Sequence, residues 1–170
     1  FNVLLLTRHC ALKDIKISEE MIIEKVERLQ TFWKKHYKNS IPKFALCSLN
    51  PHAGEGGILG DEEAKIIIPA INKLRANGID ITNPLPADTL FIEAGQNYIK
   101  GKKAPYDCYI AMYHDQGLIP IKTVASEKTV NMTIGLDIIR TSPCHGTAFD
   151  IVGKNVANPQ SMIEAIKQAL

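Results

Sequence analysis

The hydrophobic pattern of the chain contains three short runs in which nearly every position is apolar, at residues 3–7, 44–49 and 109–113. Apolar residues at successive positions, rather than at every second one, are typical of a strand in a parallel sheet that is covered on both faces. Stretches with helical spacing separate the runs. This alternation predicts βαβ units and a largely parallel sheet.

The first predicted helix lies between the first two runs. Ser18 followed by Glu19 and Glu20 is typical of a helix N-terminus, because the hydroxyl caps free N–H groups and the acids complement the helix dipole. Its apolar face is Ile22, Val26, Leu29 and Trp33, which we interpret as core. Residues 39–42 (NSIP) are expected to end the helix.

A second helix is expected to begin at residues 61–63 and to run to Asn77, with a kink at Pro69. Gly78 follows it, where a left-handed residue commonly ends a helix. The other predicted elements are a short strand at 79–82, a short helix capped by Asp88, a polar and mobile segment at 95–103, a strand at 129–134, a loop at 140–143 and a final helix capped at residues 158–159.

Three histidines follow the three apolar runs: His9, His52 and His114. The carboxyl ends of parallel strands meet at one sheet edge, where α/β proteins bind ligands. Imidazole is a common zinc ligand, and three ligands leave a position open for substrate or water. A catalytic divalent metal site is therefore one interpretation, and hydrogen-bonded loop histidines are the other.

The loop at 54–57 and three later polar residues are further candidates. The glycines allow backbone N–H groups to approach an anion, although their spacing matches neither the Walker nor the Rossmann pattern, and a turn needed only for geometry explains them equally well. Lys122, Asn131 and Arg140 suit a phosphate or carboxylate, with solvated side chains as the alternative.

Composition narrows the class of protein. The chain has 170 residues, of which 45% are hydrophobic and 22% charged, with a net charge of +2. These values argue against disorder and against a nucleic-acid-binding patch. Its four cysteines form no Cys-x-x-Cys pair, and the first apolar run is too short to span a membrane or to be a signal peptide. We expect a cytoplasmic protein, and the missing initiator Met suggests a lost N-terminal portion.

Several blocks of sequence, in order, resemble the 4-hydroxythreonine-4-phosphate dehydrogenase family of pyridoxal-phosphate biosynthesis. They are residues 50–57 (NPHAGEGG), 85–89 (LPADT), 112–117 (MYHDQG), 130–131 (VN) and 139–142 (IRTS). The resemblance runs over essentially the whole chain but covers only about the second half of the usual family length.

The resemblance implies NAD-dependent oxidation and decarboxylation of 4-phosphooxy-L-threonine to 3-amino-2-oxopropyl phosphate, in a homodimer whose subunits share active sites. It implies one divalent metal (Zn, Mg or Co) on His9, His52 and His114. The substrate contacts carry over to Lys122, Asn131 and Arg140, and a carboxylate near the reacting centre to Asp88. Either Asp88 or Asp115 then relays the proton, with Lys122 beside the reacting substrate.

Residues 145–154 (HGTAFDIVGK) and 157–159 (ANP) are similar to the nucleotide loop of the isocitrate and isopropylmalate dehydrogenases. That similarity places Gly146, Thr147, Asp150 and Asn158 at the adenosine. An acid there disfavours a 2′-phosphate and so favours NAD over NADP. A capped loop before the last helix is the structural alternative.

The expected fold is a three-layer α/β/α arrangement with a largely parallel sheet, isocitrate/isopropylmalate dehydrogenase-like and incomplete. Residues 1–106 are expected to form the substrate, metal and dimerisation lobe, and residues 107–170 to return into the nucleotide-binding lobe. Two other functions stay open: a related dehydrogenase acting on another phosphorylated hydroxy acid, and a truncated, non-catalytic dimerisation or binding module. Neither nucleic acid nor membrane is an expected partner.

Overall fold

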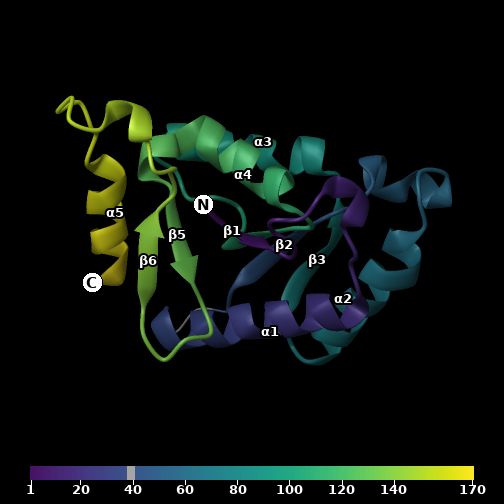
Figure 1. Cartoon of the computed structure of the whole chain (residues 1–170). Helices are drawn as coiled ribbons and strands as arrows, with labels where there is room; N and C mark the ends of the chain where they lie inside the picture. The colour runs from purple at the N-terminus through teal and green to yellow at the C-terminus, as the bar shows by residue number, and fades with distance from the viewer. Residues whose placement is uncertain (38–40) are drawn as a thin grey trace. The chain divides into compact units, whose positions relative to one another are not determined.

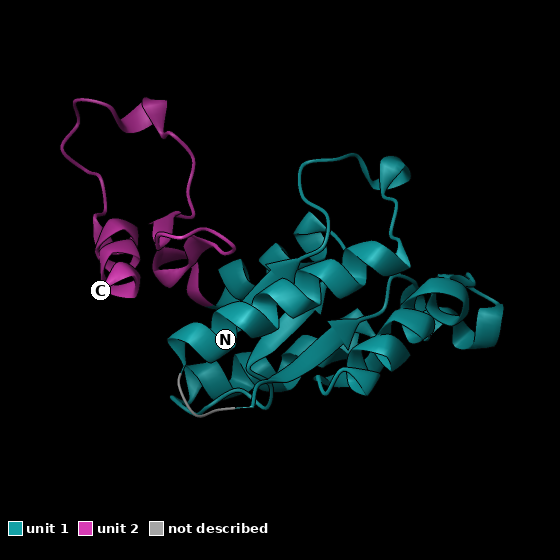
Figure 2. Ribbon diagram, turned by 90° about the horizontal axis from the view of Figure 1, so that it is seen from below, with its two compact units in different colours: residues 1–124 teal, residues 125–170 magenta. Residues whose placement is uncertain are grey.

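The computed structural model describes residues 1–37 and 41–170 and contains two compact units. Unit 1 comprises residues 1–124 and unit 2 residues 125–170 (Figure 2). The residues expected to break the first helix, Asn39 and Ser40, lie outside the described part of the chain.

Unit 1 is built on a four-stranded sheet of β1 (Asn2–Leu5), β2 (Lys43–Cys47), β3 (Asp80–Leu85) and β4 (Cys108–Ala111). The strand order is β1-β4-β2-β3, and every pair is parallel. Ile110 pairs with Leu4 on one side and with Leu46 on the other, so β4 is central. The expected parallel sheet is confirmed; β2 and β4 are buried along nearly their whole length, whereas β1 and β3 are only partly buried.

Helices cover both faces of this sheet, which gives unit 1 three layers (Figure 1). On one side lie α1 (Glu19–His36) and α2 (Ile68–Ala76), and on the other α3 (Ala87–Ile99) and α4 (His114–Ala125). Alternate side chains of each strand serve the two sides. In β2, Ala45 and Cys47 pack in one cluster with Leu90 of α3, whereas the Phe44 ring contacts Trp33 of α1.

The start of α1 follows the predicted capping chemistry. The Ser18 hydroxyl accepts a hydrogen bond from the Met21 backbone N–H over 3.2 Å, which satisfies one of the free donors of the first turn. The four apolar residues predicted as core, Ile22, Val26, Leu29 and Trp33, are all buried. Burial of this stripe explains why the segment is helical.

The segment before α2 differs from the single kinked helix expected there. Residues Glu63–Ile67 form a π-helical turn, and α2 begins at Ile68 with Pro69 in its first turn. The Ile68 N–H still donates to the Glu63 carbonyl, and Pro69, which has no N–H to donate, stands where the π-helical turn passes into α2. Gly78 has a φ of 76°, as its place after the helix predicts.

Three other expectations need correction. Helix α3 continues to Ile99, because its inner face packs on the sheet even though residues 95–99 look polar, so much of the segment at 95–103 is regular. Asp88 lies inside its first turn and Pro86 precedes it, so Asp88 is not the cap. Residues 140–143, expected as a loop, form a strand paired with the one before it.

Unit 2 contains a two-stranded antiparallel ribbon, one α-helix and two short 3-10 turns, at Ser126–Lys128 and Phe149–Ile151. The ribbon is β5 (Val130–Thr133) with β6 (Arg140–Pro143), and the helix is α5 (Gln160–Ala169). The Thr141 hydroxyl donates to the Ala165 carbonyl over 2.8 Å, which ties β6 to α5. The N-cap of α5 is Pro159, within the predicted cap at residues 158–159, and Asn158 Oδ1 accepts from the Gln160 N–H over 2.9 Å.

The described residues contain no disulfide and no helix suited to crossing a membrane. All four cysteines are free, and Cys47 and Cys108 are buried. Among residues 1–37 and 41–170, we found no helix with the length and apolar character needed to cross a membrane.

Candidate functional site

The three histidines follow three neighbouring strands at the same edge of the sheet. His9 follows β1, His114 follows β4, and His52 follows β2, with β4 between the other two. Because all strands are parallel, their carboxyl ends meet at one edge. The site therefore depends on the strand order, which brings together residues far apart in the sequence.

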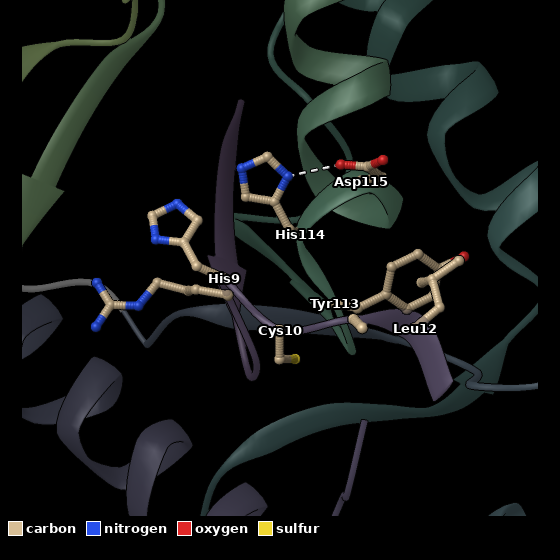
Figure 3. Close-up of a pocket in the computed structure, with 8 residues that line it drawn as sticks. His9, Cys10, Leu12, Tyr113, His114 and Asp115 are labelled. Carbon is tan, nitrogen blue, oxygen red and sulfur yellow. Dashed lines mark hydrogen bonds and ion pairs between the residues drawn. The ribbon is translucent and has the colours of Figure 1, made fainter. Parts of the chain in front are cut away.

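An open cleft of about 330 Å³ lies at this edge, between the segment after β1 and the start of α4. Its lining residues are Arg8, His9, Cys10, Ala11, Leu12, Tyr113, His114 and Asp115. The rings of His9 and His114 lie side by side, with centroids 5.5 Å apart and planes inclined by 46° (Figure 3). Two imidazoles thus share the cleft.

Asp115 holds the His114 ring from one side. His114 Nδ1 lies 2.6 Å from Asp115 Oδ1, and the dashed line in Figure 3 marks this contact. A carboxylate on one ring nitrogen favours the tautomer protonated there, so that the other nitrogen carries the free lone pair. This arrangement is common for histidines that bind metals.

His9 and His114 fit a zinc-type cation as a donor pair. In the described parts of the chain, however, no three His, Cys, Asp or Glu side chains come together as a possible metal site. His52 is not joined to the pair. Its side chain is 68% exposed, and its Nδ1 lies 4.0 Å from Glu55 Oε2.

His52 belongs to a left-handed turn, which we call the His52 loop (residues 50–57). The five residues from His52 to Gly56 all have φ between 45° and 79°. Three of them are not glycine, and such residues are disfavoured in this conformation. An observed run of this kind needs support from the surrounding structure.

That support comes from polar side chains that sequence reasoning missed. Glu63, only 4% exposed, accepts hydrogen bonds from the backbone N–H groups of Leu49 and Asn50. Gln116 accepts from the Met112 N–H and donates to the Ser48 carbonyl. One signal was present: Glu63 continues the apolar series of Ile67, Ile71 and Leu74 at helical spacing, so a carboxylate occupies a core position.

Positive charge lies near the end of β1. Lys25 Nζ donates to the Leu6 carbonyl, and Arg8 lines the cleft. Partial burial lowers the pKa of Lys25, and the neighbouring Arg8 lowers it further. Cations at this edge are suited to an anionic ligand.

Lys122 shares a helix face with His114 and Asp115, since it lies eight residues after His114 on α4. A second hollow of about 400 Å³ runs along this face and is lined by His114, Asp115, Leu118, Ile119, Lys122 and Thr123. The structure therefore brings Lys122 to the same helix surface as the two residues proposed near the metal.

Asn131 and Arg140 lie on one face of the ribbon in unit 2. Asn131 pairs with Ser142, and Thr133 pairs with Arg140, so all four side chains share a face. Arg140 Nη1 donates to Thr133 Oγ1 over 3.0 Å. Thr141, on the other face, contacts α5.

The predicted nucleotide residues are also in unit 2. Gly146, Thr147 and Asp150 are exposed in the segment after β6. Asn158 is exposed as well. Its Nδ2 donates to Glu127 Oε1 over 3.0 Å, and its Oδ1 accepts from the N–H of Gln160, the first residue of α5. In unit 1, Asp88 is exposed in the first turn of α3.

Sequence comparison and structure comparison both match this chain to dehydrogenases of phosphorylated hydroxy acids. A relative from Sulfurihydrogenibium sp. (strain YO3AOP1), named 4-hydroxythreonine-4-phosphate dehydrogenase, is 48% identical over 99% of this chain and 50% of its own length. The enzyme of that name from Bradyrhizobium diazoefficiens is 50% identical over 96% of this chain and 46% of its own. A D-threonate 4-phosphate dehydrogenase from Cupriavidus necator is 45% identical over 98% of this chain and 49% of its own.

Among solved structures, 4-hydroxythreonine-4-phosphate dehydrogenase from Klebsiella pneumoniae matches with a TM-score of 0.83 and 38% identity, over 98% of this chain and 49% of that one. The chain spans about half the length of the curated relatives it matches. The family model of the pyridoxal phosphate biosynthetic protein PdxA matches residues 1–169. The chain therefore belongs to the PdxA family of dehydrogenases.

Proposed function

We propose that this chain is part of a cytoplasmic enzyme that oxidises and decarboxylates 4-phosphooxy-L-threonine in pyridoxal 5′-phosphate biosynthesis, with NAD and one divalent metal (Zn, Mg or Co). The observation that carries the proposal is the pair of imidazoles, His9 and His114, in a cleft at the carboxyl edge of the sheet. Membership of the family supports the dehydrogenase activity.

In this proposal His9, His52 and His114 would hold the metal, which would supply Lewis-acid chemistry when bound. Lys122 and Arg140 hold the anionic groups of the substrate, with Asn131 beside Arg140 on the ribbon. Holding both ends keeps the C3 hydrogen directed at the nicotinamide. The active sites are shared between the two subunits of a homodimer.

The reaction itself then needs one base. Bound NAD⁺ would supply the acceptor for the C3 hydride, and either Asp88 or Asp115 would accept the hydroxyl proton. The resulting 3-oxo acid loses its carboxylate as CO₂ and takes up a proton to give 3-amino-2-oxopropyl phosphate. Asp115 touches His114, whereas Asp88 starts α3, so the two carboxylates have different neighbours.

NAD is proposed to bind at Gly146, Thr147, Asp150 and Asn158. Asp150 is exposed, so its carboxylate is free to accept hydrogen bonds from ribose hydroxyls. The same charge would repel a 2′-phosphate, which favours NAD over NADP.

The experiment that tests the metal-dependent activity uses the complete enzyme. Chelation is expected to abolish turnover of 4-phosphooxy-L-threonine, and added divalent metal is expected to restore it. His52→Ala is expected to abolish activity, while His36→Ala, at an exposed histidine of α1, serves as the matched control. Full activity in the chelated enzyme would contradict the metal role.

A second candidate function is oxidation of another phosphorylated hydroxy acid. This alternative is supported by the relative from Cupriavidus necator, which is 45% identical and is named D-threonate 4-phosphate dehydrogenase. Side-by-side turnover of the two substrates distinguishes them. Turnover of neither, in the complete enzyme with metal and NAD, would instead support a non-catalytic binding or dimerisation module.

A further inference from the structure

We propose that Glu63 is a positioning residue that fixes the His52 loop, an inference that rests on the proposed role of His52 as a metal ligand. Glu63 lies in the π-helical turn before α2 and touches none of the proposed ligands directly. Its effect on the site would therefore pass through the backbone that carries His52.

The contacts of Glu63 are concentrated on the start of the His52 loop. Its Oε1 accepts from the backbone N–H groups of Leu49 over 2.9 Å and Asn50 over 2.8 Å. Its Oε2 accepts from Asn50 Nδ2 over 3.0 Å. Hydrogen bonds to a buried carboxylate are stronger than those between neutral groups.

The conformation of the loop explains why such an anchor is needed. Its left-handed turn includes His52, Ala53 and Glu55, for which positive φ is unfavourable. Gly54 allows the loop to close on the anchor, since a Cβ there would lie 2.9 Å from Glu63 Oε2. The carboxylate thus holds a segment that would otherwise relax to other conformations.

The same network reaches the strand that leads to His114. Ser48 Oγ donates to the Asn50 carbonyl over 2.9 Å, and the Ser48 carbonyl accepts from Gln116 Nε2 over 2.8 Å. Glu63, Asn50, Ser48 and Gln116 therefore form a continuous series of hydrogen bonds between the π-helical turn and α4. Mutation of a residue that hydrogen-bonds to a metal ligand commonly changes metal affinity or activity by about 10- to 100-fold.

Two variants of the complete enzyme test the proposal. Glu63→Leu removes all three hydrogen bonds. Glu63→Gln keeps nearly the same volume and one accepting oxygen, but places an NH₂ group against the Asn50 amide. The matched control is Glu62→Gln, since Glu62 contacts the Asn50 side chain over 2.6 Å and is not bonded to the Leu49 or Asn50 backbone.

Amide hydrogen exchange reports directly on the loop. In Glu63→Leu the Leu49 and Asn50 amides are expected to exchange roughly 10- to 100-fold faster than in the wild type, with a smaller increase in Glu63→Gln and none in Glu62→Gln. The Co²⁺ concentration for half-maximal activity is expected to rise by about 10- to 100-fold, while the KM for NAD stays unchanged. Excess Co²⁺ is expected to restore kcat.

Wild-type exchange rates at Leu49 and Asn50 in both Glu63 variants would overturn the proposal. So would a loss of kcat that excess Co²⁺ does not restore, since that outcome indicates general damage. The proposed function can fail separately: if the chelated wild-type enzyme is fully active, the metal role is lost, yet the exchange rates still decide whether Glu63 holds the loop.

Discussion

The side-chain amide of Gln116 donates to the Ser48 carbonyl and accepts from the Met112 N–H, so that one side chain joins the carboxyl ends of β2 and β4. His114 follows β4 and His52 follows β2. The relative position of two proposed ligands therefore depends on this amide as well as on the sheet.

We expect Gln116→Leu to lower stability by about 1–3 kcal/mol, because buried backbone groups at Met112 and Ser48 lose their partners. Activity should fall further than the loss of folded protein explains. Chemical denaturation and kcat/KM measure the two effects. Gln96→Leu, at an exposed position of α3, is the control and should leave both nearly unchanged.

Gly117 and Gly95 should respond oppositely to alanine. A Cβ at Gly117 would meet Val3 and Leu5 side-chain atoms at 2.6 and 2.7 Å, whereas a Cβ at Gly95 meets Val124 at an ordinary 3.4 Å. Gly117→Ala is expected to destabilise the protein by about 1–3 kcal/mol through overpacking. Gly95→Ala should stabilise it by about 0.5–1 kcal/mol, since alanine favours the helix. Thermal unfolding of both variants measures this. Equal shifts in unfolding temperature for the two would contradict the prediction.

Asp115 and Asp88 are distinguished by the contacts of their carboxylates. Asp115→Ala removes the partner of His114 Nδ1 and should weaken divalent metal binding by about 10- to 100-fold in a direct titration. Asp88→Ala should leave metal affinity unchanged. If Asp88 relays the proton, kcat falls in Asp88→Ala although its metal affinity is unchanged. An unchanged kcat in Asp88→Ala would assign the relay to Asp115.

The buried thiols predict a pH dependence. Burial raises the pKa of Cys47 and of Cys108 to about 12, from an ordinary value near 9. The unfolded chain therefore loses these protons at lower pH than the folded one, so stability should fall as pH rises above about 9. Denaturation midpoints between about pH 8 and pH 10 measure this. Cys108→Ala should flatten the profile, and a thiol reagent should label exposed Cys10 long before either buried thiol.

Asp150 should determine the choice of nucleotide. Replacing it by Asn removes the charge that repels a 2′-phosphate, so the ratio of kcat/KM for NAD to that for NADP should fall by about tenfold or more. Steady-state kinetics with both nucleotides measure the ratio. An unchanged ratio would place the adenosine away from Asp150.

The sequence was most informative where burial determines the pattern. Continuous apolar runs identify covered strands, and the residues that follow them lie at one sheet edge. This pattern predicts His9, His52 and His114 at that edge, and the structure brings the rings of His9 and His114 together there. Strand β6 was missed because residues 140–143 (RTSP) have neither alternation nor apolar character. Pairing with β5 and contact with α5 stabilise it, and these interactions are non-local.

The site was harder to derive than the sheet. The left-handed conformation of the His52 loop depends on hydrogen bonds to a carboxylate thirteen residues along the chain from Asn50. Local propensity does not show such a contact; from the sequence, Glu63 is predicted only as part of a helix start. The position of His52 relative to the other two histidines was therefore beyond what periodicity and spacing provide.

The β5–β6 ribbon has a consequence for how this segment tolerates insertions and deletions. Neighbouring residues of each strand lie on opposite faces of the ribbon. Asn131 and Arg140 are on one face, and Thr141, on the other, contacts α5. Length changes between the strands, at residues 134–139, leave that register intact. Deleting one residue within β6 would exchange the faces, turning Arg140 toward α5 and a helix-packing side chain toward water, so the two regions should differ sharply in deletion scanning.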